Sequence, residues 1–200
     1  MLLNHKRITV WNWQGDESLC PECGEPLSAK RGDIVVWHWA HKPCRHKKRD
    51  CDHYETNWHL RWKSAYNEFE NWNIEVPIGS LNSYRIDAMN TQTGRIREFV
   101  HSLSAKYKNK HAELKNSGFD VLWIIDGNEF VSLRSCEING VGIRKMLKPS
   151  ALEFAESVDF NAIVHYENQL YKHWKNNIWY PIETMRAKEL LYRFRNARVA

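Results

Sequence analysis

The sequence predicts a mixed α/β fold that is preceded by a small cysteine-rich module and followed by a helical extension. Three observations support this prediction. Cysteine and histidine gather in the first 52 positions, helical and strand patterns alternate between 53 and 148, and helical spacing returns from 149 onward. We therefore expect a module over residues 1–52, an α/β core over 53–148 and helices over 149–200.

Composition supports a packed core. The chain has 200 residues, 42% of them hydrophobic and 26% charged, a balance that excludes wholesale disorder. No stretch approaches the roughly 18 apolar residues of a membrane helix, and the first residues lack an apolar signal segment, so we expect a cytoplasmic protein. The net charge is +5, and basic residues cluster at Lys42–Arg49 and over 106–115. Such clusters suit a phosphate backbone and suit a solvated surface equally well.

The first module predicts a structural zinc site. Cys20 and Cys23, within Cys-Pro-Glu-Cys-Gly, have the spacing that lets two thiolates reach one tetrahedral ion. In a reducing compartment, clustered cysteines are metal ligands more often than disulfides. His38 and His41 supply two imidazoles, and residues 25–37 between the two pairs predict a hairpin, the usual frame of a zinc ribbon. We therefore expect Zn²⁺ on Cys20, Cys23, His38 and His41.

The fourth zinc ligand has an alternative. His38 and His41 are three residues apart, which places them on opposite faces of an extended strand. Both bind one ion only if the strand ends near Trp39 and turns. Otherwise Cys44 or Cys51 completes the site together with His41. A closed site with four protein ligands leaves no position for substrate, so this zinc is expected to stabilise the fold.

The core shows a definite order of elements. Periodicity predicts a helix over 53–70, strands over 74–78, 83–89 and 95–100, a helix over 104–117 and a strand over 119–125. Helix, three strands, helix and strand is the core order of the PD-(D/E)xK nuclease fold. Many α/β domains contain this order, so the positions of acidic residues are needed to distinguish the nuclease fold from the others.

Three acids occupy informative positions in this order. Glu55 begins the first helix, Asp87 lies in the second strand and Glu98 lies in the third. If Asp87 and Glu98 face the same side of a hairpin, their carboxylates converge on one hard cation, with Glu55 as a further ligand. Each acid alone is more simply a solvated carboxylate with a local partner. Three acids in this order favour a magnesium or manganese site.

Residues 149–200 predict helices that cover the sheet or form a dimer arm. We expect helices over 151–158, 161–174 and 184–198, with a turn at 179–181. An extension that binds a partner or clamps DNA is the functional alternative.

Taken together, these motifs resemble the CoiA-like competence family over about residues 18–130. The resemblance rests on Cys20-Pro-Glu-Cys-Gly, His38-Trp-Ala-His41, Cys51-Asp, Glu55-Thr-x-x-His59-x-x-x-Lys63, Arg85-x-Asp87, Glu98-Phe-x-His-Ser102 and Val121–Gly127. It implies a zinc-ribbon-like module, a PD-(D/E)xK nuclease domain and DNA as the substrate. Relatives of this kind occur near phages and other mobile elements.

One departure from the family pattern concerns Val100. Many members carry Gln there, and the wider superfamily carries Lys, whereas valine neither orients water nor neutralises a phosphate. Lys63 lies two helical turns after Glu55 and can reach the same pocket, and Lys106 or Lys110 of the next helix can reach back.

The sequence therefore predicts a Mg²⁺- or Mn²⁺-dependent DNA nuclease. Its candidate catalytic residues are Glu55, Asp87, Glu98, Lys63 and Lys106. His59 is expected to pack or hydrogen-bond rather than act as a general base. The alternative is a catalytically inactive zinc protein of a phage or mobile element that binds nucleic acid or a host protein.

Overall fold

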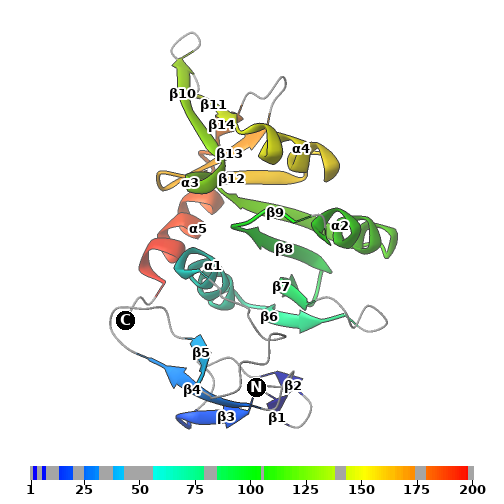
Figure 1. The fold of residues 1–200 in the computed structure, drawn as a ribbon, viewed down its shortest axis with the longest axis vertical. Helices are drawn as coiled ribbons and strands as arrows, with labels where there is room; N and C mark the ends of the chain where they lie inside the picture. Colours follow the sequence, from blue (N-terminus) through cyan, green and yellow to red (C-terminus); the bar gives the residue numbers. More distant parts are fainter. Residues whose placement is uncertain are drawn as a thin grey trace.

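The computed structural model describes residues 2–3, 6–7, 14–19, 25–31, 38–42, 56–78, 85–104, 106–137, 143–173 and 179–197. Its centre is a seven-stranded sheet with the strand order β14-β13-β12-β9-β8-β7-β6 (Figure 1). The strands are β6 (Trp72–Pro77), β7 (Arg85–Asn90), β8 (Arg95–Val100), β9 (Asp120–Asp126), β12 (Ala162–Tyr166), β13 (Gln169–His173) and β14 (Trp179–Pro181).

The sheet is mixed. β8, β9 and β12 run parallel to one another, whereas β6 and β7 on one side, and β13 and β14 on the other, are antiparallel to their neighbours. β9 lies in the middle and is apolar along almost its whole length, which is the pattern of a strand covered on both faces. The predicted α/β class and the predicted buried strand near 119–125 are confirmed.

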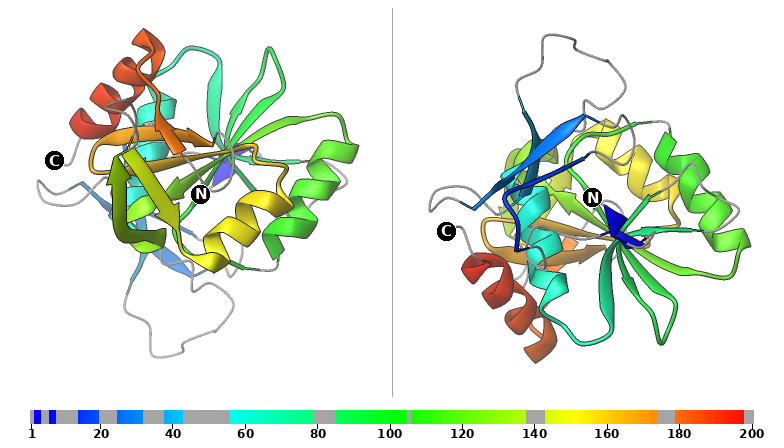
Figure 2. Two further views of the ribbon diagram at one scale, coloured as in Figure 1. Left: turned by 90° about the horizontal axis from the view of Figure 1, so that it is seen from above. Right: turned by 90° about the horizontal axis from the view of Figure 1, so that it is seen from below.

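Four helices cover the two faces of the sheet. α1 (Asn57–Asn67) and α5 (Met185–Asn196) lie on one face, and α2 (Lys106–Asn116) and α4 (Pro149–Ser157) lie on the other (Figure 2). Threonine side chains cap the first pair, since Thr56 accepts the His59 N–H and Thr184 accepts the Ala187 N–H. One apolar cluster joins the sheet to α1 and α5, and a second joins it to α2 and α4.

Shorter elements surround this core. The N-terminal part contains the pair β1 (Leu2–Leu3) and β2 (Lys6–Arg7) and the small sheet of β3 (Glu17–Leu19), β4 (Pro26–Lys30) and β5 (His38–His41). After β9 come the short helix α3 (Gly127–Phe130) and the antiparallel pair β10 (Val131–Glu137) and β11 (Ile143–Leu147).

The expectation of a helical extension over 149–200 is wrong in its middle part. Helices form over α4 and α5, but the predicted helix over 161–174 is instead the hairpin of β12 and β13. Its turn residues, Glu167 and Asn168, both have a positive φ, which is the geometry of a two-residue hairpin turn. β12 pairs with β9, so this segment completes the central sheet rather than extending from it.

Candidate active site

The turn between β7 and β8 aligns two carboxylates. Asn90 Oδ1 accepts the N–H groups of Gln92 and Thr93, and Gly94 closes the turn with a φ of +67°. Ala88 then pairs with Arg97, and Met89 pairs with Ile96.

One step further along the same register are Asp87 and Glu98. Here the Asp87 carboxylate itself accepts the Phe99 N–H, at 2.9 Å. The hairpin thus places these two acids side by side, as the alternation of the strands predicts.

Two basic side chains from α1 approach Asp87. His59 Nε2 lies 3.1 Å from Asp87 Oδ1, and Lys63 Nζ lies 3.4 Å from the same oxygen. A step of four residues places His59 and Lys63 on one stripe of the helix, as the sequence indicates. Burial favours the neutral acid, but the charges of His59, Lys63 and Lys110 outweigh it and hold the pKa of Asp87 well below its ordinary value. Asp87 is therefore a carboxylate at neutral pH.

Glu98 lies in a different environment on the neighbouring strand. Its side chain is almost fully buried, and Lys110 Nζ from α2 lies 2.7 Å from Oε2. Lys110 also donates to the Arg85 carbonyl, at 2.6 Å. Burial, followed by the charge of Asp87, raises the pKa of Glu98 to about 8, although Lys110 acts in the opposite direction. The other oxygen, Oε1, is buried and has no donor among the described residues.

Glu75 is a third acid at this site, and it is not among the residues predicted from the sequence. It lies in β6 between the pairs that Ile74 and Val76 form with β7, and so opposite Asp87. Lys63 pairs with it, and Arg85 Nη1 lies 2.9 Å from its Oε2. Its φ of +59° is rare for a residue other than glycine. Simple alternation along β6 predicts an ordinary solvent-facing acid here, and no local signal in the sequence reveals the left-handed backbone that turns it toward Lys63.

The structure also corrects the choice of lysine on α2. Lys106 lies in the exposed first turn of the helix, whereas Lys110, one turn later, is buried against Glu98. The lysine that reaches the acid pair is therefore Lys110 and not Lys106. Val100 is fully buried in the apolar cluster toward α2 and α4. Glu55 lies outside the described residues.

His101, which the sequence places on the other face from Glu98, pairs with a different acid. Its Nδ1 lies 2.9 Å from Asp126 Oδ2, at the ends of the parallel strands β8 and β9. Asp126 Oδ1 in turn accepts the Asn128 N–H and so caps α3. The contacts of this pair give it a structural role at the ends of the strands.

Most of the basic residues on α2 are neutralised locally. Lys108 lies 2.9 Å from Glu153, and Lys115 pairs with Asp159. The predicted basic surface over 106–115 is thus largely a set of ion pairs with α4 and the turn that follows it. The other basic run, Lys42–Arg49, lies outside the described residues except for Lys42, which pairs with Glu17.

Little of the predicted zinc site falls on described residues. Cys20, Cys23, Cys44 and Cys51 lie outside them. The hairpin predicted over 25–37 falls only in part on described residues, where β4 pairs with β5, with Lys30 opposite His38 and Leu27 opposite His41. Because β5 continues through His41 without turning at Trp39, positions 38 and 41 lie on opposite faces of the strand. This geometry favours the alternative in which Cys44 or Cys51 joins His41.

The described part of the chain lacks two general features. No group of three or more His, Cys, Asp or Glu residues there is arranged to hold a metal ion. No helix among those residues has both the length and the apolar character needed to cross a membrane.

Comparison with known proteins gives one match. The family model described as competence protein CoiA, N-terminal domain, matches residues 2–53. No curated protein and no solved structure matches the chain. The matched segment contains the predicted zinc ligands and ends before the acids of β7 and β8, so it supports the family resemblance independently of the site described above.

Proposed function

We propose that this CoiA-like chain, whose residues 2–53 match the N-terminal domain of the family, is a metal-dependent DNA nuclease with a PD-(D/E)xK core. The observation that carries the proposal is the convergence of Asp87 and Glu98 with the buried cation Lys110. The order α1, β6, β7, β8, α2, β9 is the one that this fold requires, and it supports the proposal.

The acid pair fits a hard divalent cation. Magnesium is commonly held by one or two carboxylates, with water and substrate oxygens completing the shell. Asp87 and Glu98 provide two carboxyl groups, and the buried Oε1 of Glu98 has no donor among the described residues, so a cation or a shared proton would satisfy it. When bound, Mg²⁺ or Mn²⁺ would acidify a water molecule and stabilise charge on the scissile phosphate.

The surrounding residues of the chain have defined tasks in this proposal. Lys110 supplies beside Glu98 the positive charge that Val100 cannot supply, and it favours the carboxylate form that a metal requires. Lys63 and His59 hold Asp87 ionised and fix the position of Oδ1. The Phe99 N–H holds Oδ2, so both oxygens of Asp87 are oriented before any ligand arrives.

Single isosteric substitutions test the proposal. Asp87→Asn and Glu98→Gln should each reduce Mg²⁺- or Mn²⁺-dependent cleavage by roughly 100-fold or more, while the folded structure remains. Asp120→Asn is the matched control, because Asp120 is an exposed acid at the start of β9 that forms an ion pair with the exposed Arg95, at 3.5 Å. If the unmodified protein leaves single-stranded, duplex and branched DNA uncut with either ion, the nuclease assignment is refuted.

A non-catalytic function is the second candidate, and a specific observation favours it. The acids already have basic partners in His59, Lys63 and Lys110, which is also how a purely structural cluster is satisfied. In that case the chain binds DNA or a host protein without cutting. A titration with Mn²⁺ separates the two candidates. Thermal stabilisation that Asp87→Asn abolishes supports the metal site, and binding of DNA without any response to Mn²⁺ supports the adaptor.

For the N-terminal module we propose a structural zinc held by Cys20, Cys23, His41 and either Cys44 or Cys51. The carrying observation is the regular strand β5, which separates positions 38 and 41. Metal analysis of purified variants tests it. His41→Ala should lose zinc and His38→Ala should retain it, and the reverse result would restore the set that contains His38.

A further inference from the structure

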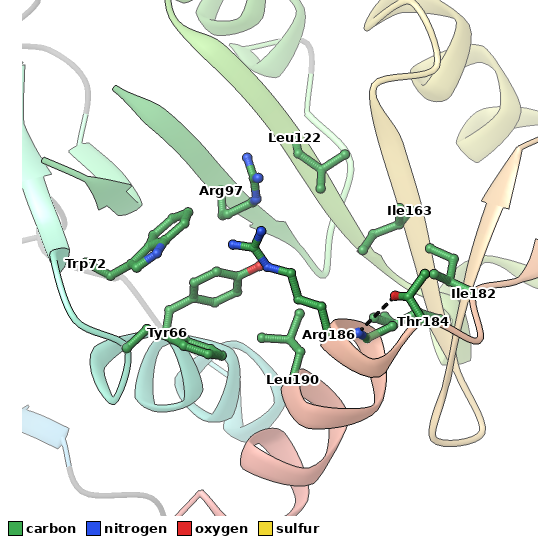
Figure 3. Close-up of a pocket in the computed structure, with 12 residues that line it drawn as sticks. Tyr66, Trp72, Arg97, Leu122, Ile163, Ile182, Thr184, Arg186 and Leu190 are labelled. Carbon is green, nitrogen blue, oxygen red and sulfur yellow. Dashed lines mark hydrogen bonds between the residues drawn. The ribbon is translucent and has the colours of Figure 1, made fainter. Parts of the chain in front are cut away.

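A pocket lies on the face of the sheet that α1 and α5 cover, which is the face away from α2. It has a volume of about 230 Å³ and is bordered by α1, α5 and the strands β6, β8, β9, β12 and β13 (Figure 3). Aromatic side chains come from α1 and β6, and aliphatic side chains come from the sheet and from α5. The lining includes Tyr66, Trp72, Arg97, Leu122, Arg186 and Leu190.

Two arginines converge in this pocket. Arg97 comes from β8 and Arg186 from the first turn of α5, and Figure 3 shows the Tyr66 hydroxyl pointing toward both guanidinium groups. Burial raises the pKa of Tyr66, while a hydrogen bond with Arg97 and the charge of Arg186 act in the opposite direction. Both positive charges therefore act on the same hydroxyl group.

No carboxylate balances these charges within the described structure. None of the residues that line the pocket is acidic. Among the ion pairs of the described residues, neither Arg97 nor Arg186 has an acidic partner. Arg97 instead donates to the Ile96 carbonyl at 2.6 Å and lies over the Trp72 ring at 5.4 Å. Two neighbouring guanidinium groups without a counter-charge favour an anion between them.

The rest of the pocket adds two properties. The N-terminus of α5, a helix of 12 residues, contributes positive potential from its first turn next to Arg186. The remaining wall is apolar, with Leu122 on the sheet and Leu190 on α5. A ligand that fits both parts has a charged head and an apolar body.

We propose that this pocket binds a small organic anion, either a carboxylate or a phosphate monoester. Its charged group lies between Arg97 and Arg186, and its body, about the size of one aromatic ring, lies between Trp72 and Leu190. The volume is below the usual range of about 300–1,000 Å³ for pockets that take drug-sized ligands, which limits the ligand to this size. This site uses neither Asp87 nor Glu98 and is independent of the proposed nuclease reaction.

Calorimetric titration of the full chain, without added divalent metal, tests the proposal. The probes are phenyl phosphate and phenylacetate as anions with a ring, phenol as the neutral ring, and inorganic phosphate as the anion alone. We expect dissociation constants on the order of 10 μM to 1 mM for the two ring anions, as is usual for ligands of this size. Phenol and inorganic phosphate should each bind at least about tenfold more weakly, since each lacks one half of the interaction. Tighter binding of one ring anion identifies whether phosphate or carboxylate is preferred.

Substitutions on α5 provide the matched comparison. Arg186→Ala should weaken phenyl phosphate binding by about tenfold or more, because a charged hydrogen-bond donor is lost. Lys188→Ala removes another exposed cation from the same helix, one that does not line the pocket, and binding should not change. Arg97→Lys, which keeps the charge but loses the planar fork, should also weaken binding.

Three results would overturn the proposal. The first is that neither ring anion binds measurably at about 10 mM, well above the expected range. The second is that phenol binds as tightly as phenyl phosphate. The third is that Arg186→Ala and Lys188→Ala weaken phenyl phosphate binding equally. Circular dichroism of each variant identifies any that fail to fold, and Arg97→Lys then serves in place of Arg186→Ala.

Discussion

Arg97 and Glu98 are consecutive residues of β8, yet they belong to opposite electrostatic environments. Glu98 faces α2 in a buried cluster where each carboxylate has a cation within reach. Arg97 faces α1 and α5 in an open pocket where two cations meet without an acid among the described residues. Alternation along a strand allows this, because the sheet separates the two faces. In the first environment the cations are engaged by the buried acids, whereas in the second the two arginines have no acidic partner among the described residues and can bind a ligand.

The largest effect expected from this difference is on the acidic side. Lys110→Met removes a buried cation that serves both Glu98 and the Arg85 carbonyl. Because removing one partner leaves buried polar groups uncompensated, we expect a loss of about 3–5 kcal/mol in the free energy of unfolding. Urea denaturation at neutral pH measures it.

Lys106→Met is the control for this change, since Lys106 lies on the same helix but is exposed. Its free energy of unfolding should stay within about 0.5 kcal/mol of the unmodified protein. Equal effects of the two substitutions would contradict the placement of Lys110 at the acid pair.

The next effect concerns pH and Glu98. Its pKa is about 8 in the folded protein, above the ordinary value of 4.5, so the folded state retains a proton that the unfolded chain releases. Stability should therefore be highest below about pH 4.5 for this group and should fall as the pH rises to about 8. Glu98→Gln should lack this decline, and the two proteins should diverge by on the order of 4 kcal/mol between about pH 5 and pH 8.

Urea unfolding at several pH values between about 5 and 9 makes this comparison. Asp87 does not disturb it. Its lowered pKa gives stability that is present above the ordinary value of 3.8 and is lost only at lower pH. Parallel pH curves for Glu98→Gln and the unmodified protein would show that Glu98 ionises normally.

The two halves of the molecule differ in how well the sequence predicts them. From α1 to β9 the periodicity is local, so helices, strands and the hairpin that joins Asp87 to Glu98 follow from it. The hairpin of β12 and β13 is different, because Ile163, Tyr166 and Leu170 also fit a helix. Pairing of β12 with β9, almost 40 residues earlier in the chain, decides in favour of the strand. Such distant pairing leaves no periodic signal.

The site shows the same limit. Alternation within one hairpin predicts that the two acids meet, but it does not distinguish Lys110 from Lys106, since both lie on the same face of α2, one turn apart. That choice depends on how closely the helix approaches β8. The arginine pocket lies further beyond sequence reasoning, because Arg97 and Arg186 are separated by 89 positions and meet only through the packing of α5.

The smallest effect is expected on the pocket side, and it sharpens the contrast with Lys110. Arg186→Ala removes an exposed cation that lies near another cation, so little attraction is lost and some repulsion is relieved. The free energy of unfolding should stay within about 0.5 kcal/mol of the unmodified protein, or rise slightly. Urea denaturation at low and at high salt measures this change. Any stabilisation that comes from relieved repulsion between the two arginines should be smaller at high salt, because salt screens that repulsion. A loss comparable to that of Lys110→Met would mean that Arg186 has a structural partner, and the two faces of β8 would then be alike.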